Sequence, residues 1–165
     1  MGNKLVLIDG HSILNRAFYG VPLLTNADGL HTNGIYGFLN IMFKILEEEK
    51  PDYLCVAFDV KEPTFRHKMY SEYKAGRKPA PRELVEQFAP LKELLTALGY
   101  TVVEKEGYEA DDILGTLSAS CKGDDFCYIA TGDRDSLQLV SENVNVVLEK
   151  KKMGQPVSTL YDIER

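Results

Sequence analysis

Acidic residues follow short apolar runs at three separate places in this 165-residue chain. Apolar runs of four to six residues predict strands that are buried on both faces, as in a parallel sheet. The carboxyl ends of parallel strands lie along one edge of the sheet, where α/β folds bind their ligands. We therefore expect these acids to meet at one edge. They are Asp9 after residues 5–8, Asp59 after residues 53–58, and Asp133 and Asp135 after residues 126–130.

A fourth acidic group opens an amphipathic segment and consists of Glu109, Asp111 and Asp112. Carboxylates that gather at one place repel each other and lose their water, and divalent cations relieve both costs. A set made only of oxygen ligands suits Mg²⁺ or Mn²⁺. The pattern therefore indicates a metal-dependent enzyme that acts on phosphates.

The remaining pattern alternates strands with helices, which predicts an α/β fold with three layers, α/β/α, around a mainly parallel central sheet. Apolar residues recur at helical spacing in three segments, and Pro90 is expected to kink the second of them. Gly99 is expected to cap that second helix. The predicted strands are 4–8, 53–58, 100–104, 126–130 and 144–148, and the predicted helices are 33–49, 81–98 and 110–121.

The composition fits one globular domain over residues 1–165. Hydrophobic residues make up 44% of the chain and charged residues 27%, which is ordinary for a soluble protein. The strongly apolar stretches reach only about six residues, so we expect no membrane span. Three cysteines without a CxxC spacing favour reduced thiols in a cytosol over disulfides or zinc ligands.

Charge is unevenly distributed along the chain. The net charge is −6, yet residues 61–82 hold seven basic and two acidic residues, a net charge of +5, so the remainder carries −11. Four proline or glycine residues and the lack of an apolar stripe predict a partly helical, mobile excursion there. This segment is either an element that grips a polyanion or a solvated helix face, and its charge alone does not choose between them.

Each acidic group also has a structural explanation. Asp9 could simply cap the following helix, although Ser12 is expected to do so and to leave Asp9 free. His11 is expected to be a hydrogen-bonding helper, because it cannot pair with its neighbour Ser12 as base and nucleophile. A haloacid-dehalogenase phosphatase would need an aspartate where His11 stands, and a Toprim domain would need a glutamate in place of Asp9.

The group at residues 109–112 could be no more than an acidic first helical turn, which the helix dipole favours. Glu109 and Asp111 would stand about 200° apart on an ideal helix. Both can reach one site only if Glu109 lies before the regular helix begins.

Five segments, in order, resemble the 5′–3′ exonuclease domain found at the N-terminus of bacterial DNA polymerase I, in the flap-endonuclease branch of the PIN-like nucleases. The resemblance covers nearly the whole chain and implies cleavage of DNA at 5′ ends and flaps, with two Mg²⁺ or Mn²⁺ ions, in the bacterial cytoplasm at the nucleoid. The segments are LVLIDGHSILNRAFYG, YGFLNIM, VAFDVKEPTFRHKMYSEYKAGRKPAP, GYEADDILGTL and TGDRDSLQLV.

The resemblance also implies roles for single residues. Asp9, Asp59 and Glu109 would hold one metal, and Asp111 would lie between the two. Asp133 and Asp135 would hold the second metal, and Asp112 would support the cluster. The excursion at about 61–82 would be the helical arch that passes a 5′ end, with Lys74 and Arg77 on the scissile phosphate. Its DNA-binding residues would be Phe65, Arg66, Tyr73, Lys74 and Arg77.

The C-terminus predicts a fragment of a longer chain, because Thr159 looks like the N-cap of a helix with only about six residues left to form it. In the resembling family a loop with further aspartates, a helix–hairpin–helix and a polymerase region follow. Without the loop and the hairpin we expect weak or no cleavage by the 165 residues themselves. Two other functions remain open, a non-catalytic nucleic-acid or protein-binding module and a PIN-type ribonuclease, although the long excursion argues against the ribonuclease.

Overall fold

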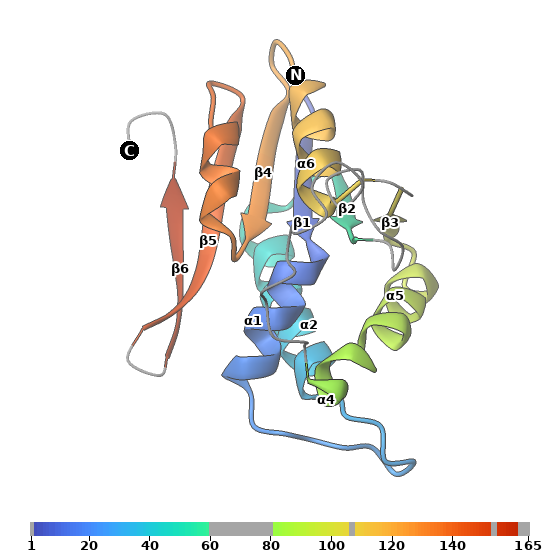
Figure 1. Cartoon of the computed structure of the whole chain (residues 1–165). Coiled ribbons are helices and arrows are strands. Elements are labelled where there is room, and N and C mark those ends of the chain that lie inside the picture. Colours follow the sequence, from blue (N-terminus) through green and yellow to red (C-terminus); the bar gives the residue numbers. More distant parts are fainter. Residues whose placement is uncertain (1, 60–80, 106–107, 153–154, 162–165) are drawn as a thin grey trace, which may run out of the picture.

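The computed structural model describes residues 2–59, 81–105, 108–152 and 155–161, with the side chains of Asp111, 149–159 and 161 outside this description. One sheet forms the centre of the molecule (Figure 1). Its order is β3-β2-β1-β4-β5-β6, and every neighbouring pair is parallel except β5 and β6. The strands are β1 (Lys4–Asp9), β2 (Tyr53–Ala57), β3 (Thr101–Val103), β4 (Phe126–Thr131), β5 (Val144–Lys152) and β6 (Gln155–Tyr161).

Helices cover both faces of the sheet, so the predicted three-layer arrangement is confirmed. On one face, α1, α2, α4 and α5 pack on side chains such as Ile8 and Val56. On the other face, α6 and the 3₁₀ helix η1 pack on their alternate neighbours, such as Leu7 and Cys55. The helices are α1 (Gly10–Gly20), α2 (Asn33–Glu49), α4 (Arg82–Val85), α5 (Phe88–Ala97), α6 (Ala110–Ala119) and η1 (Arg134–Leu139).

The alternation explains why the central strands are apolar throughout. Successive side chains of a strand point to opposite faces, and both faces are covered, so every position of β1 after Leu5 is buried. The helix predicted at 33–49 is confirmed as α2. The structure also contains none of the long apolar helices that a membrane crossing requires, within the residues it describes.

The helix predicted over 81–98 is broken, but not at Pro90. It stops at Val85, and a new helix starts at Phe88, so that Pro90 falls in the first turn of α5, where its missing N–H costs nothing. Gln87 lies at the break and is fully buried. Its Nε2 donates to Asn33 Oδ1 (3.0 Å), and its Oε1 accepts from the N–H of Ile35 (3.0 Å), which ties the break to the start of α2.

The helix N-cap predicted at Thr159 is wrong. Thr159 is not a helix N-cap but lies within β6, where it pairs with Leu148 of β5. The sequence of this hairpin is polar and shows no clear alternation of apolar and polar residues, so it does not predict a strand. The strand β6 is recognised only by its pairing with the extended end of β5. Gly99 caps the second helix as expected, with a φ of 90°.

Candidate metal centre

The strands deliver acids to one edge of the sheet, as the sequence predicted. Asp9 is the last residue of β1, and its register partner Ala57 ends β2, two residues before Asp59. β4 runs parallel on the other side of β1 and ends at Thr131, two residues before Asp133. Figure 1 shows β1 and β4 side by side, both ending near the start of α1. A close approach at Gly10 supports this arrangement, because a Cβ there would lie 2.5 Å from the Phe58 ring.

Asp9 is buried, and both of its carboxylate oxygens accept hydrogen bonds. Oδ1 accepts from the backbone N–H of Ser12 (3.2 Å), and Oδ2 accepts from the hydroxyl of Thr131 (3.1 Å). Asp9 is therefore itself the N-cap of α1, and the expectation that Ser12 would take this role is wrong. The sequence could not separate the two, because either residue type is a favourable N-cap and the choice depends on where the helix starts.

The charge of Asp9 is costly in this position. Burial raises the pKa of its carboxyl, hydrogen bonds from Ser12 and Thr131 oppose that rise, and the nearby carboxylate of Asp59 adds to it. A divalent cation beside Asp9 would reverse the balance, because an opposite charge favours the ionised form. The electrostatics of this acid therefore fit a cation site.

Asp59 connects the end of β2 to the start of α6. Its Oδ1 accepts from the backbone N–H of Ala110 (2.5 Å), and its Oδ2 lies 3.7 Å from Nδ1 of His11. The His11 ring packs against Phe88, with 4.9 Å between the ring centroids. His11 therefore lies beside the acids, but the 3.7 Å separation is longer than a hydrogen bond, so its role as a hydrogen-bonding helper remains a prediction.

Glu109 satisfies the geometric condition set by its spacing to Asp111. It is the N-cap of α6, and its backbone is extended (φ −88°, ψ 165°), so it lies before the regular helix begins. Its side chain is buried. Asp112 accepts the backbone N–H of Glu109 (3.0 Å), and its role in supporting a metal cluster remains a prediction. Asp111 is the second residue of α6, and its side chain lies outside the described part of the molecule.

Asp133 and Asp135 follow β4 on a turn that the sequence placed correctly. Asp133 is the N-cap of η1, and its Oδ1 accepts from the backbone N–H of Asp135 (2.9 Å). The backbone N–H of Asp133 donates to the Thr131 hydroxyl (3.0 Å). Asp135 is exposed in the first turn of η1. The short helix η1 itself was not predicted.

These acids form an all-oxygen donor set, which suits Mg²⁺ or Mn²⁺. Among the side chains that the structure describes, no three of the His, Cys, Asp and Glu type stand close enough together to hold a metal ion. The acids therefore share one edge of the sheet, but their described side chains do not by themselves form a metal site. Asp111 belongs to this edge by its place in α6. Its backbone position directly after Ala110 puts it next to the residue that Asp59 holds.

Two hydroxyl side chains at this edge make contacts that the sequence analysis did not predict. Thr131 is fully buried and bridges Asp9 to the turn after β4. Ser12 accepts the backbone N–H of Gly132 (2.8 Å) and lies 3.1 Å from the Thr131 hydroxyl. A threonine at the end of an otherwise apolar strand was the available signal, because a buried hydroxyl needs a polar partner.

Comparison with known proteins places this fold and these motifs in a family. The model of the 5′-3′ exonuclease, N-terminal resolvase-like domain matches residues 4–162. The chain belongs to this family. The resemblance drawn from the five motifs is thereby confirmed.

Members of this exonuclease family that resemble the chain are much longer proteins. DNA polymerase I of Caldicellulosiruptor bescii is 47% identical over 162 residues, which cover 98% of this chain and 19% of that protein. DNA polymerase I of Geobacillus stearothermophilus is 49% identical over 152 residues, which cover 92% of this chain and 17% of that protein. The chain thus spans less than a fifth of the length of these curated relatives.

Solved structures confirm the fold of the exonuclease family for this chain. The flap endonuclease of bacteriophage T5, solved with DNA and metal ions, has a TM-score of 0.63 at 21% identity and covers 87% of this chain and 54% of its own. The T5 5′-exonuclease, solved with zinc, has a TM-score of 0.62 at 21% identity, with the same coverage. The predicted resolvase-like architecture is therefore confirmed.

The predicted DNA contacts do not belong to the part of the chain that the structure describes. They all fall within 60–80, so the structure neither supports nor opposes the helical arch, of which only Pro81 and Arg82 are described. These contacts remain predictions for Phe65, Arg66, Tyr73, Lys74 and Arg77.

Proposed function

We propose that this chain is the nuclease portion of a DNA polymerase I and that it hydrolyses DNA phosphodiester bonds at 5′ ends and flaps with the help of divalent metal ions. The observation that carries this proposal is the convergence of acids at one sheet edge in a chain of this exonuclease family. They come from the ends of β1, β2 and β4 and from the start of α6.

The roles we assign follow the position of each acid. Asp9, Asp59 and Glu109 come from the ends of two adjacent strands and the N-cap of α6, and they would hold one ion. Asp111 would lie between two ions, and Asp133 and Asp135 on the β4 turn would hold the second. We favour Mg²⁺, with Mn²⁺ as a substitute, because every donor is an oxygen. When bound, such ions activate a water molecule and stabilise the leaving oxygen of the phosphodiester.

The protein contributes orientation and charge. Hydrogen bonds from Ser12, Thr131 and Ala110 fix the carboxylates of Asp9 and Asp59, which limits their freedom to turn away from an ion. The basic segment at 61–82, with Lys74 and Arg77 on the scissile phosphate, would attract a DNA strand by charge and without regard to its sequence. The setting we propose is the bacterial cytoplasm, at the nucleoid.

Cleavage of a 5′-flap DNA substrate tests this function. We expect the natural full-length protein that contains this chain to cut flaps with Mg²⁺ or Mn²⁺. Cleavage should stop when EDTA removes the metal and should be lost in the Asp111→Ala variant. The 165 residues alone should bind single-stranded DNA weakly, with affinity that falls steeply with salt, and should cut poorly. A natural full-length protein that binds flaps but never cuts them with either metal would contradict the nuclease proposal and favour a binding module.

A further inference from the structure

Thr131 has a hydrogen-bond arrangement that uses its whole capacity. Its side chain is fully buried at the end of β4. Its hydroxyl lies 3.1 Å from Asp9 Oδ2, 3.1 Å from Ser12 Oγ and 3.0 Å from the backbone nitrogen of Asp133. A hydroxyl has one proton to donate and two lone pairs that accept, so these three contacts saturate it.

The direction of each bond follows from the partners. The ionised carboxylate of Asp9 can only accept, so the single proton of Thr131 points to Asp9. The backbone N–H of Asp133 can only donate, so it occupies one lone pair of Thr131. Ser12 then donates its proton toward the other lone pair at 3.1 Å, which is closer than its alternative acceptor, the backbone carbonyl of Asp9 at 3.5 Å.

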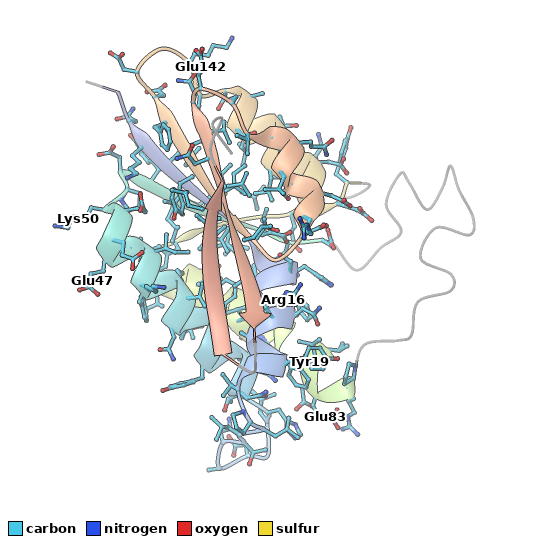
Figure 2. The ribbon with its side chains drawn as sticks, turned by 90° about the vertical axis from the view of Figure 1, so that its left-hand side faces the viewer. Arg16, Tyr19, Glu47, Lys50, Glu83 and Glu142 are labelled. Atoms are coloured by element: carbon cyan, nitrogen blue, oxygen red, sulfur yellow. The ribbon has the colours of Figure 1, made fainter. Side chains whose placement is uncertain are left out.

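Ser12 extends this chain of bonds to the turn after β4. Its oxygen accepts the backbone N–H of Gly132 at 2.8 Å. The carbonyl of Gly132 accepts from Nη2 of Arg16 on α1 at 3.3 Å, and a Cβ at Gly132 would come within 2.8 Å of Cγ of Arg16. Figure 2 shows Arg16 on α1, from which its side chain reaches this turn. The turn that carries Asp133 is thus held against α1 by two separate contacts.

We propose that Thr131, completed by Ser12, is a positioning residue that keeps the Asp9 carboxylate in register with the Asp133 turn, so that the acids of the two ion sites move as one unit. The proposal rests on the proposed function, because it concerns ions that these acids would hold. It predicts that loss of the Thr131 hydroxyl weakens both sites together, whereas loss of the Asp133 carboxylate weakens only one.

The test compares Thr131→Val, which removes the hydroxyl at nearly constant shape, with Thr131→Ser, which keeps it. Ser118→Ala is the control, because Ser118 is also buried but donates only to the carbonyl of Gly115 within α6. Amide hydrogen exchange of Asp133 in the metal-free protein reports the coupling itself, and calorimetric titration with Mn²⁺ reports its consequence. Substitution of a residue that hydrogen-bonds to a metal ligand typically lowers the affinity for the metal by about tenfold or more.

We expect Thr131→Val to lose the exchange protection of the Asp133 amide and about tenfold in Mn²⁺ affinity. Thr131→Ser should restore both, and Ser118→Ala should change neither. Protection and affinity that stay at the wild-type level in Thr131→Val, or that fail to return in Thr131→Ser, would overturn the proposal. If Thr131→Val does not fold, Ser12→Ala tests the same coupling, and unchanged exchange of the Gly132 amide in that variant would overturn the proposal as well.

The two proposals fail in different ways. A wild-type chain that binds no Mn²⁺ would defeat the proposed function. Loss of Asp133 amide protection in Thr131→Val, with recovery in Thr131→Ser, would still establish that the hydroxyl holds the Asp133 turn. Wild-type Mn²⁺ binding with no effect of either substitution would defeat the positioning role alone.

Discussion

Acids lie at both ends of the same parallel strands, and the two edges of the sheet use them differently. At the amino edge, Asp52 accepts the backbone N–H of Lys4 (2.7 Å), and Asp125 accepts that of Asn3 (2.9 Å). Asp52 lies just before β2 and Asp125 just before β4, the two strands on either side of β1. Figure 2 shows Glu142 at the top of the molecule, before β5 begins, and Arg16 lower down on α1, which follows the carboxyl end of β1. At the carboxyl edge, by contrast, Asp9 and Asp59 are close enough for one charge to raise the pKa of the other acid, beyond the larger effect of burial.

The difference shows that an acid at a strand end is not in itself a sign of a binding site. Asp52 and Asp125 each accept a hydrogen bond that joins one strand to the next. This bond is enough to explain why an acid stands at each position. Asp9 and Asp59 also make bonds of this kind, to the starts of α1 and α6. What distinguishes the carboxyl edge is that Asp9 is buried there near Asp59, so that its charge is costly.

The largest expected difference between the edges is the response to metal. We expect Mn²⁺ to raise the melting temperature of the wild type, because a ligand that binds only the folded state adds about 2.7 kcal/mol of stability at about a hundred times its dissociation constant. Asp59→Asn should lose most of this gain, and the matched variant Asp52→Asn at the amino edge should keep it. Thermal melts with and without Mn²⁺ measure both, and equal losses in the two variants would erase the distinction.

A smaller effect is expected at the amino edge, where a substitution should lower stability without changing the response to Mn²⁺. The amide of Asn143 donates to the carbonyls of Gly123 (2.9 Å) and Asp125 (2.8 Å) at the amino edge. Asn143→Ala leaves these carbonyls without that partner and should cost about 1–2 kcal/mol of unfolding free energy. Urea denaturation measures the loss, and the gain from Mn²⁺ should stay at the wild-type value. A variant that is as stable as the wild type but insensitive to Mn²⁺ would mean that the two edges are not independent.

The smallest effect is a dependence on pH in the metal-free protein. The pKa of Asp9 is raised in the folded state, so the folded protein binds a proton more readily than the unfolded chain. The stability contributed by this residue therefore falls as the pH rises from the ordinary aspartate value of 3.8 through the raised value, and stays low above it. Asp9→Asn should flatten this part of the profile and stabilise the metal-free protein near neutral pH. Melting temperatures measured across acidic pH with EDTA would contradict this if both proteins gave the same profile.

The sequence was sufficient where the signal was local. The apolar runs that end in Asp9 and Asp59 directly indicate buried strands. The spacing of apolar residues over 33–49 directly indicates a helix. The parallel sheet and its acidic edge follow from them, and the motifs were specific enough to indicate the family. The break before α5 could not be placed, because it depends on the buried amide contact between Gln87 and Asn33, which are 54 residues apart.

By itself the sequence determined the fold class, the edge at which the acids gather and the family, since all three rest on which residues are apolar and which acids follow them. Only the tertiary structure decided how the acids are held. That Asp9 caps α1, that Thr131 ties it to the Asp133 turn and that β6 pairs with β5 depend on contacts across the fold, such as the 122 residues between Thr131 and Asp9. Hydrogen bonds between segments far apart in the sequence depend on how the segments pack, and a local sequence pattern does not specify that packing.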